Sequence, residues 1–275
     1  MGAAKTTHIA PVTGDEGIDW GELRASTDLL YLLVWRNLAL RYKQTLIGAG
    51  WAVLQPLTTM IILSFVFGRL ARLPSDGLPY PIFYYSGLLP WMYFSSALSA
   101  ATNSIADHQR VITRVYFPRV LLPTAAILAA LVDFAVAFVA LLPLLLLYGV
   151  RPTAALFAVP LFAAVAAAAA LGVGLFFAAL NARYRDLRYV LQFLLTLWMF
   201  VSPVTYPASL VPWHWQWLYG LNPLAGAIEG FRWAVSGSTP PSLLLLVASA
   251  ASATVLVVAG ARYFQRIDPD MADFV

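Results

Sequence analysis

Six apolar segments constrain this chain more than any other feature of its sequence. Each holds about 18 or more predominantly apolar residues, enough for an α-helix to cross about 30 Å of hydrocarbon. Of the 275 residues, 61% are hydrophobic and 11% are charged. We therefore predict an all-α integral membrane protein with six transmembrane helices. The predicted spans run from Ile47 to Gly68, Pro81 to Ser104, Leu121 to Tyr148, Thr153 to Leu180, Tyr189 to Tyr206 and Ser242 to Tyr263.

The distribution of Lys and Arg orients these spans. With a cytoplasmic N-terminus, the inner segments hold 13 of the 17 cations. This bias predicts that both termini are cytoplasmic, in agreement with an even number of spans. It also explains the net charge of +4 without nucleic acid, since no Lys/Arg run exceeds two residues. The four cations predicted on the outside are Arg69, Arg72, Arg151 and Arg232.

The ends of the chain carry no predicted span. Residues 1–26 contain four acidic side chains and no apolar core of a signal peptide, so we expect a flexible cytoplasmic tail. Residues 46–266 form the predicted membrane domain, and residues 267–275 form a short cytoplasmic C-terminal tail. The run AAVAAAAALGVG from Ala163, within the fourth span, predicts close helix packing because its side chains are small.

A basic amphipathic segment, residues 27–45, directly precedes the first span. Arg36, Arg41 and Lys43 fall on one side of a helix at 100° per residue, and an aromatic side faces the other way. Such a helix is expected to lie in the membrane surface, with its cations among anionic headgroups. Gly48 and Gly50 would let the chain turn into the bilayer. By itself, this segment could be a simple anchor.

Two further connections have distinctive chemistry. The segment of about residues 105–117 carries Asp107, His108, Arg110 and Arg114 before Pro118, which predicts a short cytoplasmic docking helix. The alternative is that these are ordinary inner-side charges. On the outer side, residues 207–240 have two apolar runs too short to span, as in a re-entrant helical hairpin. Its aromatic residues predict either an interfacial belt or the lining of a path for sugars or lipid.

Several functions lack their required residues. No G-x-x-x-x-G-K-[ST] phosphate loop occurs, so this polypeptide is not expected to hydrolyse ATP. Neither a His/Glu metal cluster nor a G-x-S-x-G motif is present, and there is no cysteine. Asp133 is the one acid well inside a predicted span. It predicts either a carboxylate held by polar neighbours or a part of a substrate path or subunit contact, and argues only weakly for ion-coupled transport.

Three sequence blocks carry a family resemblance. RNLALRYKQTLIGAGWAVLQPL from Arg36, YPIFYYSGLLPWMYFSSAL from Tyr80 and RVITRVYFPRVLLP from Arg110 resemble the permease subunits of ABC-type polysaccharide exporters. That family exports lipid-linked O-antigen, teichoic acid, galactan or capsule chains. The resemblance implies a homodimer in the inner (plasma) membrane with two separate ABC subunits that bind ATP and Mg, whereas this chain itself has no cofactor. The nearest alternative is an ABC permease of the same fold exporting a drug, haem or lipid.

The resemblance also implies roles for particular residues. Contact with the ATPase would involve Asp107, His108, Arg110, Arg114 and Tyr116. The polysaccharide or its lipid carrier would contact Trp51, Gln55, Phe65, Tyr84, Tyr85, Trp91 and Tyr93. As a hypothesis for the mechanism, the diphosphate headgroup of an undecaprenyl-type carrier would approach Arg36, Arg41 and Lys43. The sugar rings of the glycan would then stack on aromatic side chains, a contact that does not depend on the order of the sugars.

Overall fold

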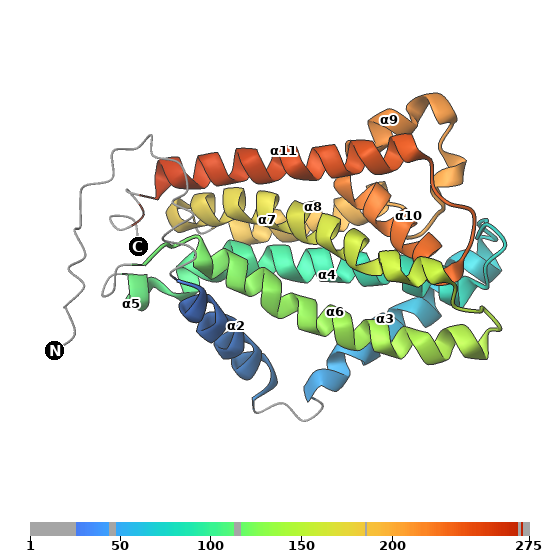
Figure 1. The fold of residues 1–275 in the computed structure, drawn as a ribbon, viewed down its shortest axis with the longest axis horizontal. Helices are drawn as coiled ribbons and strands as arrows, with labels where there is room; N and C mark the ends of the chain where they lie inside the picture. The colour runs from blue at the N-terminus through green and yellow to red at the C-terminus, as the bar shows by residue number, and fades with distance from the viewer. Residues whose placement is uncertain (1–25, 44–47, 113–116, 185, 269–270, 272–275) are drawn as a thin grey trace.

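The described part of the chain is helical. A computed structural model describes residues 26–43, 48–112, 117–184, 186–268 and 271, and these residues form helices and connections without a strand (Figure 1). The longer α-helices are α2 (Thr27–Tyr42), α3 (Trp51–Leu63), α4 (Tyr80–Asp107), α6 (Leu121–Leu147), α7 (Val159–Arg183), α8 (Leu187–Val201), α10 (Pro223–Ser236) and α11 (Leu243–Ile267).

Four helical stretches of the described residues are long and apolar enough to cross a membrane. The first of these stretches consists of the 3-10 turn η1 (Gly48–Gly50), helix α3 and the π-helix η2 (Ser64–Leu70). The 3-10 turn η3 (Ala154–Ala158) likewise leads into α7. The prediction of an all-helical membrane protein is therefore confirmed. The four stretches are Gly48–Leu70, Leu121–Leu147, Ala154–Arg183 and Leu243–Ile267.

The other two predicted spans correspond to α4 and α8. With 28 residues, α4 is about 42 Å long at 1.5 Å per residue, but it is less apolar than the four stretches. With 15 residues, α8 is shorter than a typical span. It ends at Val201 because Ser202 precedes Pro203 and adopts an extended conformation, which proline favours in the preceding residue. The number of six spans thus stays a prediction.

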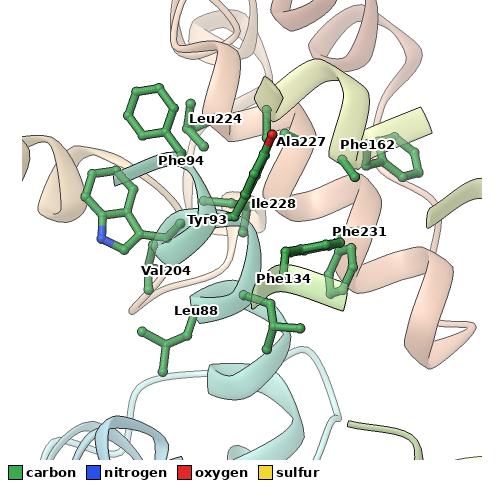
Figure 2. Close-up of a cluster of buried hydrophobic side chains, with 14 of the residues drawn as sticks. Leu88, Tyr93, Phe94, Phe134, Phe162, Val204, Leu224, Ala227, Ile228 and Phe231 are labelled. Atoms are coloured by element: carbon green, nitrogen blue, oxygen red, sulfur yellow. The ribbon is translucent and has the colours of Figure 1, made fainter. Parts of the chain in front are cut away.

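The centre of the bundle is α4, which packs against α3, α6, α7 and α10. Because neighbours surround it, side chains on several faces of α4, such as Phe83, Phe94 and Leu98, are fully buried. Figure 2 shows Tyr93 on the side of α4 that faces Phe134 of α6, whose ring also packs against Phe231 of α10. This apolar core fixes the faces of α4 and α6 that border the site described below.

Small residues bring α7 and α11 into close contact. A Cβ atom built on Gly260 would overlap the backbone carbonyl of Gly172. The two helices pack along their length, as Figure 1 shows. Gly172 belongs to the small-residue run that predicted close packing, and this prediction is confirmed.

One end of the bundle gathers α2, the end of α4, the start of α6 and the ends of α7 and α11. Leu33 of α2 is buried there with Ile105, Leu121 and Phe264. The short helix α5 (Gln109–Ile112) lies at the same end. The segment predicted to lie on the membrane surface thus packs on the bundle through Leu33, while Trp35 and Leu40 stay exposed.

The segment of residues 207–240 forms short helices. After η4 (Ala208–Leu210) and η5 (Trp213–Trp215), α9 (Gln216–Tyr219) precedes α10. Asn222 caps α10 by accepting a hydrogen bond from the Leu224 amide at 3.1 Å. The aromatic side chains divide, since Trp213 is exposed whereas Phe231 is fully buried. Helices flank Asn222 on both sides, and their re-entry into a membrane stays a prediction.

Candidate functional site

A cavity of about 660 Å³ opens between α2, α3, α4, α6 and α8. Its walls differ in chemistry: α4 and α8 contribute hydroxyl and amide groups, α3 and α4 contribute aromatic rings, and α2 and α6 contribute charge. The side chains used in the argument below are Arg41, Tyr42, Trp51, Gln55, Trp91, Tyr93, Ser95, Ser96, Ser99, Asp133, Phe134, Gln192 and Thr196.

The polar wall consists of short side chains from two helices. Ser95, Ser96 and Ser99 lie within little more than one turn of α4, and Gln192 and Thr196 are one turn apart on α8. The Gln192 amide donates to the Ser99 hydroxyl at 3.1 Å. The hydroxyls of Ser95 and Ser96 donate to carbonyls of their own helix at 3.2 Å. Their oxygens keep acceptor capacity, so this wall can accept hydrogen bonds from a hydroxyl-rich ligand.

The aromatic wall combines one open ring with two enclosed ones. Trp51 on α3 is 52% exposed, whereas Trp91 and Tyr93 on α4 are buried but still border the cavity. The ring of Tyr93 packs against Phe134, with centroids 5.5 Å apart. Among the described residues, the Tyr93 hydroxyl has no hydrogen-bond partner. Flat apolar faces of this kind suit the faces of sugar rings.

Charge enters the cavity through one ion pair. Arg41 of α2 binds Asp133 of α6 through Nη1 and Oδ2, and the Tyr42 hydroxyl donates to Oδ1 of the same carboxylate. The side chain of Arg41 is 33% exposed and that of Asp133 is 23% exposed. Of the described residues that line the cavity, these two alone carry a formal charge. Asp133 is thus held by polar neighbours, as one interpretation of its sequence position predicted, and it also lines the cavity. Its part in a substrate path or a subunit contact stays a prediction.

The three cations predicted to meet a lipid headgroup do not share one environment. Arg36 and Lys43 are exposed, whereas Arg41 is half-buried and faces α6. No local feature of the sequence indicates the Arg41–Asp133 ion pair, because the two residues are 92 positions apart. Arg41 also borders a second cavity of about 160 Å³ that reaches Asp107 and His108.

The seven residues predicted for the polysaccharide path separate into two groups. Trp51, Gln55, Trp91 and Tyr93 line the large cavity. The other three lie elsewhere: Tyr84 and Tyr85 are fully buried and Phe65 is exposed on η2. The Tyr85 hydroxyl donates to the Ala137 carbonyl at 3.1 Å, so this side chain bridges α4 and α6. In this conformation neither Tyr84 nor Tyr85 reaches the surface of the chain.

The predicted docking segment is described only in part. Asp107 ends α4 with an exposed side chain, and the His108 Nδ1–H donates to the Ser104 carbonyl at 2.7 Å. Arg114 and Tyr116 lie outside the described residues, as does the side chain of Arg110. These assignments stay predictions.

An ion pair near the same end joins α6 to α11. Nη1 of Arg119 lies 3.2 Å from Oδ1 of Asp268. Burial raises the pKa of the Asp268 carboxyl, and the neighbouring guanidinium opposes that shift.

The polar wall and Tyr42 were missed at the level of sequence. Their signal is nevertheless visible: SSALS from Ser95 and QFLLT from Gln192 each place polar side chains one helical turn apart in an apolar segment. Two such stripes on different predicted spans indicate faces that avoid lipid.

The cavity, with its polar, aromatic and charged walls, thus lies among the helices of a membrane protein. The family model for the ABC-2 type transporter matches residues 28–235, and the chain belongs to this family. The match covers every residue that lines the cavity.

Curated relatives specify the kind of transporter. An O-antigen export system permease protein, RfbA of Myxococcus xanthus, is 31% identical over 214 residues, covering 77% of this chain and 81% of that protein. A Klebsiella pneumoniae RfbA is 27% identical, covering 74% and 79%. The polysialic acid transport protein KpsM of Escherichia coli is 26% identical, covering 77% and 81%. They confirm the resemblance to permeases of polysaccharide exporters. The family consists of transport subunits.

Proposed function

We propose that this chain is the membrane-spanning subunit of an ATP-driven exporter that moves lipid-linked polysaccharide from the cytoplasmic to the outer side of the inner membrane. The observation that carries this proposal is the cavity, in which one ion pair, a hydroxyl-bearing wall and aromatic rings meet. An amphiphile with an anionic headgroup and a glycan matches all three kinds of surface. The export functions in the names of RfbA and KpsM support the same substrate class.

In the proposed mechanism, exposed Arg36 and Lys43 attract the headgroup from the membrane surface, and Arg41 binds it at the cavity. The glycan follows along Ser95, Ser96 and Ser99, whose oxygens accept hydrogen bonds from sugar hydroxyls. The ring of Trp51 stacks on sugar faces. Since these contacts recur along any glycan, they tolerate different sugars and suit the passage of a long polymer.

The energy for this movement comes from partner subunits. The sequence has no phosphate loop, and the family supports two separate ATP-binding ABC subunits that bind ATP and Mg. We place the contact with them at the end of the bundle that holds α5, with Asp107, His108, Arg110, Arg114 and Tyr116 as its residues. Arg41 borders both the large cavity and the smaller one near Asp107 and His108. This arrangement would link occupancy of the cavity to the ATPase.

The proposed assembly is a homodimer of multi-pass subunits. Here α4 and α8 are the second and fifth of six spans, and residues 207–240 form the outer re-entrant segment. The side chains of Tyr189, Phe193 and Phe200 leave one face of α8 apolar and exposed. In the dimer, this face would meet lipid or the second copy. Both termini are assigned to the cytoplasm from the bias of Lys and Arg.

A deletion strain tests the function. Without this chain, lipid-linked glycan should accumulate in the cytoplasm, and the wild-type gene should restore glycan to the cell surface. A Ser99→Ala/Gln192→Ala variant should export less, because it removes the hydrogen bond that joins the polar walls. Thr254→Ala on α11 is the matched control, since it bonds only within its own helix and lies outside the cavity. Normal surface glycan in the deletion strain, with loss of a drug, haem or lipid from the medium, would overturn the proposal.

A further inference from the structure

The guanidinium of Arg41 already has an anionic partner within the protein. Asp133 occupies Nη1 of Arg41 through Oδ2, and its other oxygen accepts from Tyr42. Arg41 is the one cation among the described residues that line the large cavity. An anionic ligand that binds Nη1 therefore competes with the Asp133 carboxylate for this donor, and the negative charge of Asp133 opposes an anion anywhere else on the guanidinium.

The geometry permits an exchange of partners. Both side chains are partly open, with 33% and 23% exposure. Loss of its partner leaves the charge of the partly buried Arg41 uncompensated, which is unfavourable. An incoming phosphate offsets this cost for Arg41, and the Tyr42 hydroxyl remains on Asp133 to stabilise its charge. A neutral lipid offers neither compensation.

From these contacts, and resting on the proposed function, we propose that Asp133 is a positioning residue that competes with the anionic headgroup for Arg41 and thereby limits how tightly the headgroup is held. A transporter has to release what it binds, and an internal competitor lowers the affinity at the cation without removing it. When the headgroup leaves, Asp133 takes its place, so Arg41 is never left as an uncompensated charge in the cavity.

The test measures binding of a defined probe. The full chain is purified with its ATPase partner and placed in phosphatidylcholine nanodiscs, which supply no net lipid charge. The probe is geranylgeranyl diphosphate, and neutral geranylgeraniol is the matched ligand control. The Asp133→Asn variant should bind the diphosphate about tenfold more tightly and release it more slowly, equivalent to about 1.4 kcal/mol. Export by this variant should fall because release is slower.

Other variants separate competition from a purely structural role. Arg41→Gln should weaken diphosphate binding. The double variant Arg41→Gln/Asp133→Asn should bind the diphosphate as Arg41→Gln does, because the guanidinium for which Asp133 competes is absent. Asp28→Asn, at the exposed start of α2 and outside the cavity, should bind like the wild type. Geranylgeraniol binding should not respond to any of these changes.

The outcomes divide cleanly. Unchanged or weaker diphosphate binding by Asp133→Asn would overturn the competition. Tighter binding that persists in the Arg41→Gln background would overturn it too, because the effect would then come from the charge of Asp133 and not from competition for Arg41. Absence of diphosphate binding by the wild type would overturn it as well. Failure of the proposed function is seen separately, as unaltered surface glycan in the deletion strain, and does not depend on the probe.

Discussion

Two ion pairs in this bundle have the same charges but different surroundings. Glu229 and Arg232 are three residues apart on α10, with Nη1 and Oε1 separated by 2.8 Å and with side chains only 13% and 3% exposed. Arg41 and Asp133 come from different helices and remain 33% and 23% exposed at a cavity. The difference lies in the further partners of each pair.

The partners of the first pair belong largely to the backbone. Arg232 donates to the Pro203 carbonyl at 2.7 Å, and Glu229 accepts from the Ala208 amide at 2.8 Å. The Arg232 guanidinium also lies 3.9 Å from the centroid of the Phe83 ring. These contacts fasten α10 to α4 and to the segment after α8. Since backbone groups cannot leave, this pair is structural.

The partners of the second pair leave room for another ligand. Asp133 is held by two side chains from the end of α2, and the space beside it is the cavity of about 660 Å³. The comparison teaches that burial and backbone partners distinguish an ion pair that maintains the fold from one that can exchange partners. Four substitutions test this distinction, from the largest expected effect to the smallest.

Arg232→Met should have the largest effect on stability. It leaves the Glu229 carboxylate without its counter-charge and the Pro203 carbonyl without its Arg232 donor, at a cost of about 3–5 kcal/mol for a broken buried pair. The melting temperature of the purified complex in detergent measures this loss. Glu229→Gln/Arg232→Met should recover part of it because no unpaired charge remains. A wild-type melting temperature for Arg232→Met would mean that the two pairs do not differ as argued.

Arg41→Gln should show the opposite pattern. Export measured in the deletion strain should fall about tenfold, equivalent to about 1.4 kcal/mol, because the cation of the cavity is lost. The melting temperature should change little, since a partly exposed pair contributes much less to stability than a buried one. The matched control is Arg262→Gln, an exposed arginine on α11. If Arg41→Gln lowered the melting temperature as much as Arg232→Met does, both ion pairs would be structural.

Gly87→Ala tests whether Arg232 is held as firmly as its contacts indicate. The new Cβ would lie 2.7 Å from Nη2 of Arg232 and 3.3 Å from the Val204 carbonyl oxygen. A flexible arginine would move aside, whereas a fixed one imposes an overpacking cost of about 1 kcal/mol, at the low end of the usual range because only one methyl group is added. We expect that cost as a lower melting temperature. In the Arg232→Met background it should shrink, and an equal cost in both backgrounds would contradict the fixed position.

The two pairs also show what the sequence can and cannot predict. Apolar length predicted the helical membrane fold because the bilayer imposes the same minimum on any span. The charge bias counted Arg232 as an outer cation, yet it is almost fully buried, because such counting ignores specific partners. Arg41 and Asp133 are joined only by tertiary packing, across 92 positions of sequence.

The aromatic residues of α4 give a second example. Tyr84 and Tyr85 lie on different sides of the helix, yet both are fully buried. Helical periodicity distinguishes an inner face from an outer face, but α4 has neighbours on several sides and lacks a single inner face. For that reason four of the seven predicted path residues line the cavity, and periodicity could not identify which four.

Tyr93→Phe should have the smallest effect and extends the comparison to uncharged groups. The Tyr93 hydroxyl is buried without a partner in the described part of the chain, so its removal should leave the melting temperature unchanged or slightly raised. Tyr85→Phe is the matched control. It removes a hydrogen bond to the Ala137 carbonyl and should cost about 1 kcal/mol.

Export by the two variants then assigns the hydroxyls. A fall in export for Tyr93→Phe at an unchanged melting temperature would place its hydroxyl in contact with the glycan, since substrate is then the partner that the resting cavity does not provide. A lower melting temperature for Tyr93→Phe, similar to that of Tyr85→Phe, would contradict the assignment, because only a hydroxyl with a partner inside the protein stabilises the fold. The same criterion therefore applies to a polar group on the cavity wall and to the two ion pairs. A group whose partner belongs to the protein stabilises the fold, and a group without such a partner can bind the substrate.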